Sequence, residues 1–318
     1  MATHPAVSTQ SALRGVFSPV LTPFNADLSP STPRMLTHCR WLLARGVGLA
    51  VFGTNSEANS LSVAEKRRLL DDLLEGGIAP QRLMPGTGAS ALPDTIELTR
   101  HAVAAGCAGV LMLPPFYYKG VTDEGLFRSY ARVIDTVADR RLRIYLYHIP
   151  PVSQVGLSLA LIERLLKAFP GTVAGIKDSS GDWNNTSAML REFQPQGFDV
   201  FAGSEAFLLA TLQAGGAGCI TATGNVNPGP IVGLFDHWRD ADAPARQQAL
   251  VETRAVFQRL PMIAAMKAAI AWHSGDADWG TLRPPLVELD AAQQRQLIAE
   301  LQSCDFTIAE AESLALPR

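Results

Sequence analysis

Lys177 and Tyr147 are the residues of this sequence whose types and positions best suit covalent chemistry. Lys177 closes the apolar run Val-Ala-Gly-Ile, and Tyr147 closes an earlier apolar run. A lysine buried at a strand end has its ammonium form disfavoured, which leaves a neutral amine available as a nucleophile. A phenol beside it can carry protons while an imine forms and a C–C bond breaks. The alternatives are a lysine that reaches into solvent or pairs with a carboxylate, and a tyrosine that only fills the core, for which Tyr145 is the better candidate.

A polar cluster follows the apolar run that ends at Gly53. Thr54, Asn55 and Ser56 offer the hydroxyl, amide and backbone donors that suit a carboxylate. The alternative is a simple hydrogen-bonded turn.

Other chemistries fit the sequence less well. The six histidines are scattered, and no set of His, Asp and Glu gathers at predicted strand ends, so we expect no catalytic metal. The glycine-rich stretch 215–218 precedes its apolar run instead of following it, which argues against a dinucleotide site. The sequence contains neither a G-x-S-x-G motif nor a G-x-x-x-x-G-K loop.

The elements that must position these residues alternate between short apolar runs and amphipathic stretches. Eight runs start about 19–34 residues apart, which is the length of one strand-plus-helix unit. They are continuously apolar, as parallel strands covered on both faces are. Eight such units favour a (β/α)8 TIM barrel, although periodicity does not exclude an open sheet. The predicted strands are Gly15–Leu21, Gly48–Gly53, Arg82–Gly86, Gly109–Leu113, Arg143–Tyr147, Val173–Lys177, Asp199–Ala202 and Gly218–Thr221.

Helix signals occur between and after these runs. Ser62 and Glu65 form a capping box, and Ser158 precedes a second apolar helical stripe. After about residue 229 only helical patterns remain, which predicts a C-terminal helical appendage. We therefore divide the chain into an N-terminal tail (1–14), a barrel (15–228) and a helical region (229–318). The helices expected in the last region are Pro244–Gln258, Met262–Trp272, Ala291–Gln302 and Ile308–Leu314.

The composition excludes several classes of protein. With 47% hydrophobic and 18% charged residues, the chain can bury a sizeable core. A net charge of −3 without any basic block argues against binding to nucleic acid or a membrane surface. No apolar stretch approaches the roughly 18 residues that span a bilayer, and no apolar segment of a secretory signal is present. The four cysteines form no C-x-x-C pair, so we expect a reduced, cytoplasmic protein.

Taken together, these motifs resemble the N-acetylneuraminate lyase / dihydrodipicolinate synthase superfamily of Schiff-base (class I) lyases, from about residue 15 to residue 289. This resemblance implies a (β/α)8 barrel, a homotetramer built as a dimer of dimers, or a dimer, and no metal or organic cofactor. The motifs that carry it are Gly53–Glu57, Pro114–Tyr118, Tyr147–Pro150, Gly175–Asp178 and Arg283–Leu286.

The resemblance also implies roles for single residues. Lys177 matches the lysine that forms an imine with a 2-oxo acid, and Tyr147 and Thr54 match its proton relay. Tyr118 matches a tyrosine that a neighbouring subunit contributes. The resemblance places the following residues at or beside the substrate: Asn55, Ser56, Val152, Ser179, Gly203, Glu205 and Ile220.

Departures from the family pattern concern the substrate. Dihydrodipicolinate synthases have an arginine where this chain has Val152, and an apolar side chain cannot replace a bidentate carboxylate clamp. The acidic pair and serine that hold the sugar tail in sialic acid lyases correspond to Glu205, Ala206 and Ala222, which keep one polar group. Ser56 and His148 also replace commoner residues.

The sequence therefore predicts a lyase that forms a Schiff base with pyruvate or a short 2-oxo acid. We expect aldol cleavage or dehydration of a 2-keto-3-deoxy or 4-hydroxy-2-oxo acid. One alternative is dihydrodipicolinate (4-hydroxy-tetrahydrodipicolinate) synthase, which condenses pyruvate with aspartate semialdehyde. Another is a non-catalytic protein that binds 2-oxo acids, and a third is an ordinary barrel whose site lies elsewhere.

Overall fold

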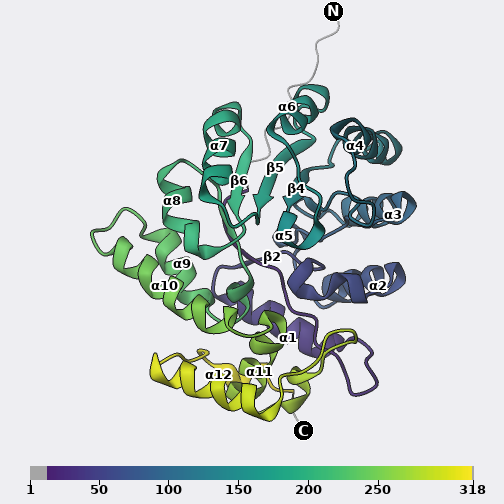
Figure 1. Ribbon diagram of the computed structural model, residues 1–318. Helices are drawn as coiled ribbons and strands as arrows, with labels where there is room; N and C mark the ends of the chain where they lie inside the picture. Colours follow the sequence, from purple (N-terminus) through teal and green to yellow (C-terminus); the bar gives the residue numbers. More distant parts are fainter. Residues whose placement is uncertain (1–12, 317–318) are drawn as a thin grey trace, which may run out of the picture.

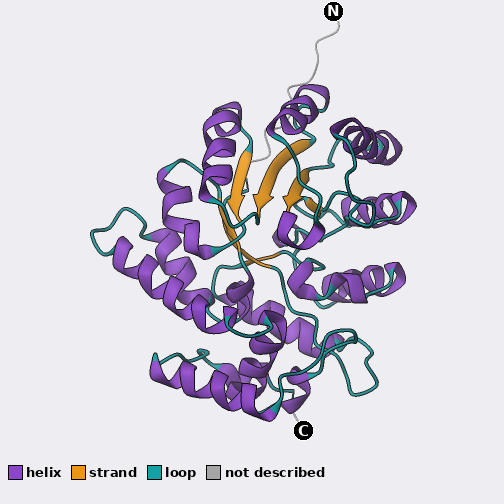
Figure 2. Ribbon diagram, viewed as in Figure 1, coloured by secondary structure: helices purple, strands orange, loops and turns teal. Residues whose placement is uncertain are grey.

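A computed structural model describes residues 13–316 of the chain, so most of the predicted N-terminal tail and the last two residues lie outside it. Seven parallel strands form one sheet in the order β2-β1-β7-β6-β5-β4-β3, at the centre of the molecule (Figures 1 and 2). The strands are β1 (Gly15–Ser18), β2 (Gly48–Leu49), β3 (Val110–Met112), β4 (Ile144–His148), β5 (Val173–Asp178), β6 (Asp199–Ala202) and β7 (Gly218–Ile220).

The eighth predicted strand, Arg82–Gly86, is not a regular strand, and this prediction needs correction. Its residues lie between the edge strands β2 and β3 and make only isolated parallel bridges, Leu49 to Leu83 and Gly86 to Leu111. Pro85 lies between the two bridges, and proline has no N–H to donate to a ladder. The segment nevertheless hydrogen-bonds to both edges of the sheet, through the amide of Gly86 to Val51 O (2.7 Å) and the amide of Leu111 to Pro85 O (2.9 Å).

Helices cover the outer side of the sheet (Figure 1). The predicted caps are confirmed: Ser62 and Glu65 form a capping box at α2, and the Ser158 hydroxyl accepts from the amide of Leu161 at α6. Helices up to residue 236 are α1 (Thr32–Ala44), α2 (Val63–Glu75), α3 (Leu92–Ala104), α4 (Asp123–Val137), α5 (Pro150–Ser153), α6 (Leu159–Ala168), α7 (Trp183–Phe193), α8 (Leu208–Gln213) and α9 (Pro228–Asp236).

The C-terminal part contains the helices α10 (Ala243–Gln258), α11 (Met262–Ser274) and α12 (Ala291–Ser303), close to the predicted bounds. The expected last helix shortens to a 3₁₀ turn, η8 (Ala311–Leu314). Arg283 ties this part to the N-terminal half, because its guanidinium donates to Leu28 O (2.6 Å) and to the Glu65 carboxylate (2.8 Å).

Two apolar clusters stabilise the fold. The larger one lies between the sheet and the helices and is held by burial of aliphatic side chains. The smaller one contains buried residues from five of the seven strands, from the 82–86 segment and from the positions next to β2 and β7. Its members are Phe17, Ala50, Met84, Leu111, Tyr145, Tyr147, Phe201, Ala217 and Ile220. Because side chains alternate across a strand, these residues share the face of the sheet opposite the helices.

Candidate active site

Lys177 and Tyr147 lie side by side on neighbouring strands. Tyr147 in β4 pairs in register with Lys177 in β5. The Lys177 Nζ lies 4.2 Å from the centroid of the Tyr147 ring, and each residue is 2% exposed. Lys177 follows the apolar residues of a largely buried strand and lies one residue before the end of that strand. Its amine is therefore shielded from bulk water. The two predicted catalytic residues are therefore brought together.

Thr54 completes a chain of three groups. Its Oγ1 lies 3.1 Å from the Tyr147 hydroxyl. Tyr147 therefore lies between the Lys177 amine and the Thr54 hydroxyl. Thr54 begins η1 (Thr54–Ser56), the 3₁₀ turn that follows the β2 run. Ser56 fixes this turn, because its Oγ accepts from the amide of Gly53 (3.1 Å) and its carbonyl accepts from Thr22 Oγ1 (2.7 Å). Asn55, between them, is half-buried.

The backbone on both sides of Thr54 is strained. Phe52 has φ 61° and Glu57 has φ 54°, although neither is glycine. Such conformations cost about 1–3 kcal/mol each and persist only where the surroundings hold them. Gly86 allows the close approach, because a Cβ there would lie 2.1 Å from Phe52 O.

Tyr145, two residues before Tyr147, points to a different partner. Its hydroxyl donates to Asp199 Oδ2 (3.0 Å) at the start of β6. Burial raises the pKa of Asp199 to about 6, against the opposing hydrogen bonds from Tyr145 and the Leu13 backbone. Tyr145 therefore supports the core, and Tyr147 alone of this pair lies beside Lys177.

Asp199 predicts a pH dependence of stability. Its folded-state pKa, about 6, exceeds its ordinary value of 3.8, so the native state binds more protons than the unfolded state between these values. The stabilisation is thus complete below pH 3.8 and is lost as the pH rises through 6. Relative to Asp199→Asn, the wild type should lose about 2–3 kcal/mol of unfolding free energy between pH 4 and pH 7, measured by urea denaturation. Parallel curves for the two proteins would contradict this assignment.

Three predicted substrate contacts lie near the same strand ends. Ile220 ends β7 and is fully buried in the smaller apolar cluster. The amide of Gly203 donates to Asp178 O (2.7 Å), and the amide of Ser179 donates to His148 O (2.7 Å). A Cβ at Gly203 would lie 2.0 Å from Ser179 Oγ, so only glycine fits there.

The carboxylate of Glu205 is occupied by contacts with other residues of the protein. Its carboxylate, 1% exposed, accepts from the hydroxyls of Thr221 and Thr223. It also forms an ion pair with Arg254 of α10 (2.8 Å). Sequence reasoning missed Arg254 and Thr223, and no local pattern indicates them, since Arg254 lies 49 positions further along the chain. The predicted contact of Glu205 with substrate gains no support from this geometry.

Tyr118 and Val152 lie on the surface of the chain. Their exposed fractions are 72% and 61%, and neighbouring Tyr117 is 73% exposed. The structure of the single chain does not bring Tyr118 to Lys177. Lys119 joins the loops that carry these residues, because its Nζ donates to Ser153 O (2.8 Å) as well as to Phe116 O.

His148 and Asp178, next to Tyr147 and Lys177 in sequence, have structural partners. His148 Nδ1 accepts from the amide of Leu157 (2.9 Å), and burial lowers the pKa of His148 against the attraction of the Asp178 carboxylate. Asp178 Oδ2 accepts from Thr186 Oγ1 (2.6 Å) and from Asn185 (3.1 Å). Both side chains therefore anchor the strand ends.

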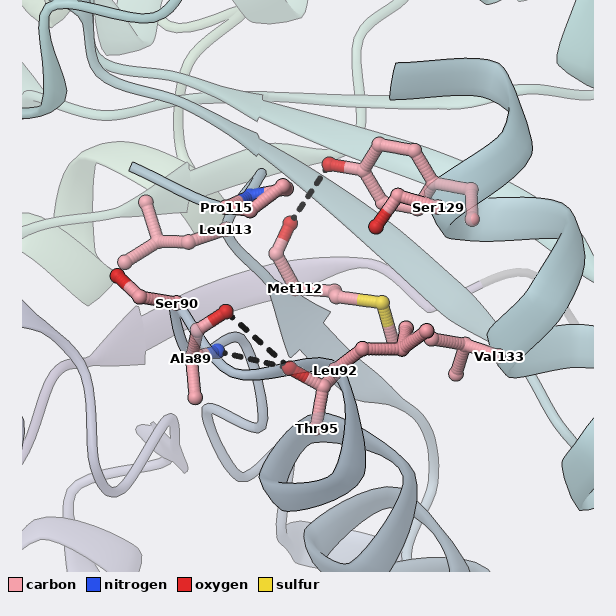
Figure 3. A pocket seen from close by; sticks show the side chains of 10 residues that line it. Ala89, Ser90, Leu92, Thr95, Met112, Leu113, Pro115, Ser129 and Val133 are labelled. Carbon is pink, nitrogen blue, oxygen red and sulfur yellow. Dashed lines mark hydrogen bonds between the residues drawn. The ribbon is translucent and has the colours of Figure 1, made fainter. Parts of the chain in front are cut away.

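A separate cavity of about 30 Å³ lies beside β3, α3 and α4 (Figure 3). It holds one or two waters at most. Thr95 Oγ1 bonds to the backbone of Ala89 at its wall (3.0 Å). No predicted site residue lines it; the lining residues are Ala89, Ser90, Leu92, Thr95, Met112, Leu113, Pro115, Ser129, Tyr130 and Val133.

Residues 13–316 also bear on two other properties, metal binding and membrane insertion. No group of three or more His, Cys, Asp or Glu there is arranged to hold a metal ion. None of the helices in this part of the chain combines the length and the apolar character needed to cross a membrane.

A buried lysine beside a tyrosine and a threonine at the ends of parallel strands is the arrangement that an imine-forming lyase needs. A model of the dihydrodipicolinate synthetase family matches residues 12–304. The chain belongs to this family, which confirms the predicted membership.

Relatives and solved structures agree. An uncharacterized DapA-like lyase of Chloroflexus aurantiacus is 36% identical over 281 residues, covering 87% of this chain and 92% of the relative. The putative 2-dehydro-3-deoxy-D-gluconate aldolase YagE of Escherichia coli is 31% identical, covering 93% and 99%. The structure of YagE in complex with pyruvate has a TM-score of 0.84, covering 92% of this chain and 99% of YagE at 29% identity. The structure of dihydrodipicolinate synthase from Agrobacterium tumefaciens also has a TM-score of 0.84. It covers 91% of this chain and 99% of the synthase, at 29% identity. The predicted lyase class is thus confirmed.

Proposed function

We propose that this protein is a class I lyase that cleaves or dehydrates a short 2-oxo acid through an imine on Lys177. The observation that carries the proposal is the Tyr147 side chain, whose ring lies against the Lys177 amine while its hydroxyl contacts Thr54 Oγ1. The pyruvate complex of YagE, a relative with the same fold, supports it.

The reaction begins when Lys177 Nζ adds to the ketone carbon and water leaves. In cleavage, Tyr147 takes the proton of the C4 hydroxyl, and the electron pair of the C3–C4 bond moves into the iminium. An aldehyde departs, C3 of the enamine takes up a proton, and hydrolysis releases pyruvate and Lys177. In dehydration, C3 loses a proton and the C4 hydroxyl leaves as water. Thr54 passes protons between Tyr147 and its surroundings.

The remaining residues position the substrate. Asn55, with the backbone of the turn that Ser56 fixes, holds the substrate carboxylate. Gly203, Ser179 and Ile220 line the pocket around the rest of the molecule, and Glu205 closes its wall together with Arg254. Tyr118 acts in the site of a neighbouring copy in a homotetramer or dimer, which accounts for its 72% exposure in the single chain.

The fold that holds the site is a closed (β/α)8 TIM barrel over residues 15–228 with a helical appendage over 229–318. Hydrogen bonds from the 82–86 segment to β2 and β3 support closure. Residues 1–14 form the tail, and the protein acts in the cytoplasm, in keeping with its unpaired cysteines.

A synthase that condenses pyruvate with aspartate semialdehyde is the second candidate. Val152 supplies no guanidinium for the aldehyde's carboxylate, which favours the lyase. Lys119 favours the synthase, because its ammonium contacts Ser153 O, one residue from Val152, and offers a different cation. Saturation with aspartate semialdehyde at low concentration would select the synthase.

Incubation with pyruvate and sodium borohydride, followed by peptide mapping, tests the proposal. We expect a reduced adduct on Lys177. An adduct only with a longer 2-oxo acid would retain the mechanism and favour a dehydratase. The absence of any adduct would overturn the imine and leave a protein that only binds 2-oxo acids.

A further inference from the structure

We infer that Lys267, in helix α11 of the C-terminal part, is a positioning residue for Thr54 and acts through a buried ion pair with Glu57. The inference rests on the proposed function, in which Thr54 passes protons to Tyr147. It assigns to the C-terminal region a part in the reaction itself.

Glu57 is fastened directly to the turn that carries Thr54. Its amide donates to Thr54 O (3.1 Å), which closes the 3₁₀ turn. Its φ of 54° directs the chain into the next turn, η2 (Ala58–Ser60), in a conformation that favours glycine. A shift of the Glu57 side chain is therefore transmitted to the Thr54 hydroxyl through three residues of tightly bonded backbone.

The Glu57 carboxylate is held entirely by the C-terminal region. Its Oε1 pairs with Lys267 Nζ, and both side chains are 0% exposed. Its Oε2 accepts from the amide of Arg283 (3.3 Å). Lys267 in turn donates to Thr281 O (2.9 Å) and lies 4.6 Å from the centre of the Phe24 ring.

Loss of one partner should disturb this buried ion pair more than it would disturb a surface ion pair. Burial raises the pKa of Glu57 and lowers the pKa of Lys267, and their mutual attraction opposes both shifts. Removal of one partner leaves the other buried without compensation. The remaining group then becomes neutral or displaces the strained turn. A movement of about 1 Å away from the reactive geometry can lower a rate by about 10²-fold.

Arg34 offers a matched control. It forms ion pairs with Asp276 (2.8 Å) and Asp278 (2.6 Å), so it also joins the N-terminal half to the segment after α11. The Arg34 side chain is 10% exposed and none of its hydrogen bonds goes to the 53–57 turn. Arg34→Met should lower stability without changing the position of Thr54.

The experiment measures exchange of the C3 protons of pyruvate in D₂O by NMR, because this reaction needs only imine and enamine formation. We expect Lys267→Met to lower the rate constant at saturating pyruvate by about 10²-fold, with KM within about twofold. Arg34→Met should stay within about twofold of the wild type. In a Thr54→Val background, Lys267→Met should add less than about twofold, since both changes remove one function.

The outcomes distinguish a failure of the positioning role of Lys267 from a failure of the proposed imine on Lys177. Equal rates for Lys267→Met and the wild type, or an undiminished effect of Lys267→Met in the Thr54→Val background, would overturn the inference. Should Lys267→Met not fold, Glu57→Gln removes the charge at nearly constant shape and must show the same rate loss and the same non-additivity. Borohydride adducts on Lys177 should form in every variant; their absence in the wild type would overturn the proposed function and this inference with it.

Discussion

Lys177→Ala is expected to abolish turnover and borohydride trapping completely. The proposed imine requires an amine at this point of the site, and alanine supplies none. Lys177 is 2% exposed and lies against the Tyr147 ring, so no other lysine of the described chain has the same surroundings. Pyruvate exchange in D₂O, together with intact mass after borohydride reduction, measures both effects.

A matched control for this variant is Lys66→Ala. Lys66 is also buried, at 6% exposure, but it lies on α2 outside the sheet. Burial lowers the pKa of Lys66, so it tests whether a desolvated amine alone suffices for adduct formation. Lys66→Ala should keep both adduct and exchange. An adduct that persists in Lys177→Ala would show that the imine lysine has been misassigned.

Tyr147→Phe is expected to lower the exchange rate by roughly 10²–10⁴-fold, the usual contribution of an acid–base group. The substitution keeps the ring beside Lys177 and removes only the hydroxyl that contacts Thr54 Oγ1 at 3.1 Å. Slow trapping of an adduct on Lys177 should therefore survive, because the amine remains while proton transfer is impaired. Comparison of trapping and exchange rates in the same preparation separates these steps.

Tyr145→Phe provides the control for Tyr147→Phe. It deletes the same atom two residues earlier on the strand, where the hydroxyl bonds to Asp199. We expect lower stability and nearly unchanged exchange from this variant. An exchange rate within about twofold of wild type for Tyr147→Phe, or a larger loss for Tyr145→Phe, would exclude Tyr147 as the proton carrier.

Much of the site could be predicted because it depends on local patterns. Continuous apolar runs indicate the strands, and the ends of parallel strands meet at one edge, so Lys177, Tyr147 and Thr54 had to lie close together. The helix caps at Ser62 and Ser158 are equally local, since donor and acceptor are three residues apart.

The partners of the buried carboxylates could not be predicted in this way. Glu205 pairs with Arg254 and Glu57 pairs with Lys267, 49 and 210 positions apart. Such contacts depend on how helices pack against the sheet, for which no short spacing is diagnostic. The proposed contact of Tyr118 with the substrate of a neighbouring copy is also beyond a local pattern, because in the single chain this side chain is 72% exposed.

The segment with Pro85 has a consequence for dynamics. It joins β2 and β3 by isolated bridges, and one ladder hydrogen bond is missing because proline has no amide hydrogen. β2 beside it has only two residues, whereas β4 and β5 pair along their length. Local opening follows the weakest pairing. Amide hydrogens of this segment, such as that of Gly86, should therefore exchange with solvent deuterium before those of β4 and β5. Thermal fluctuations should thus first open the backbone pairing of the 82–86 segment, next to the Thr54 turn.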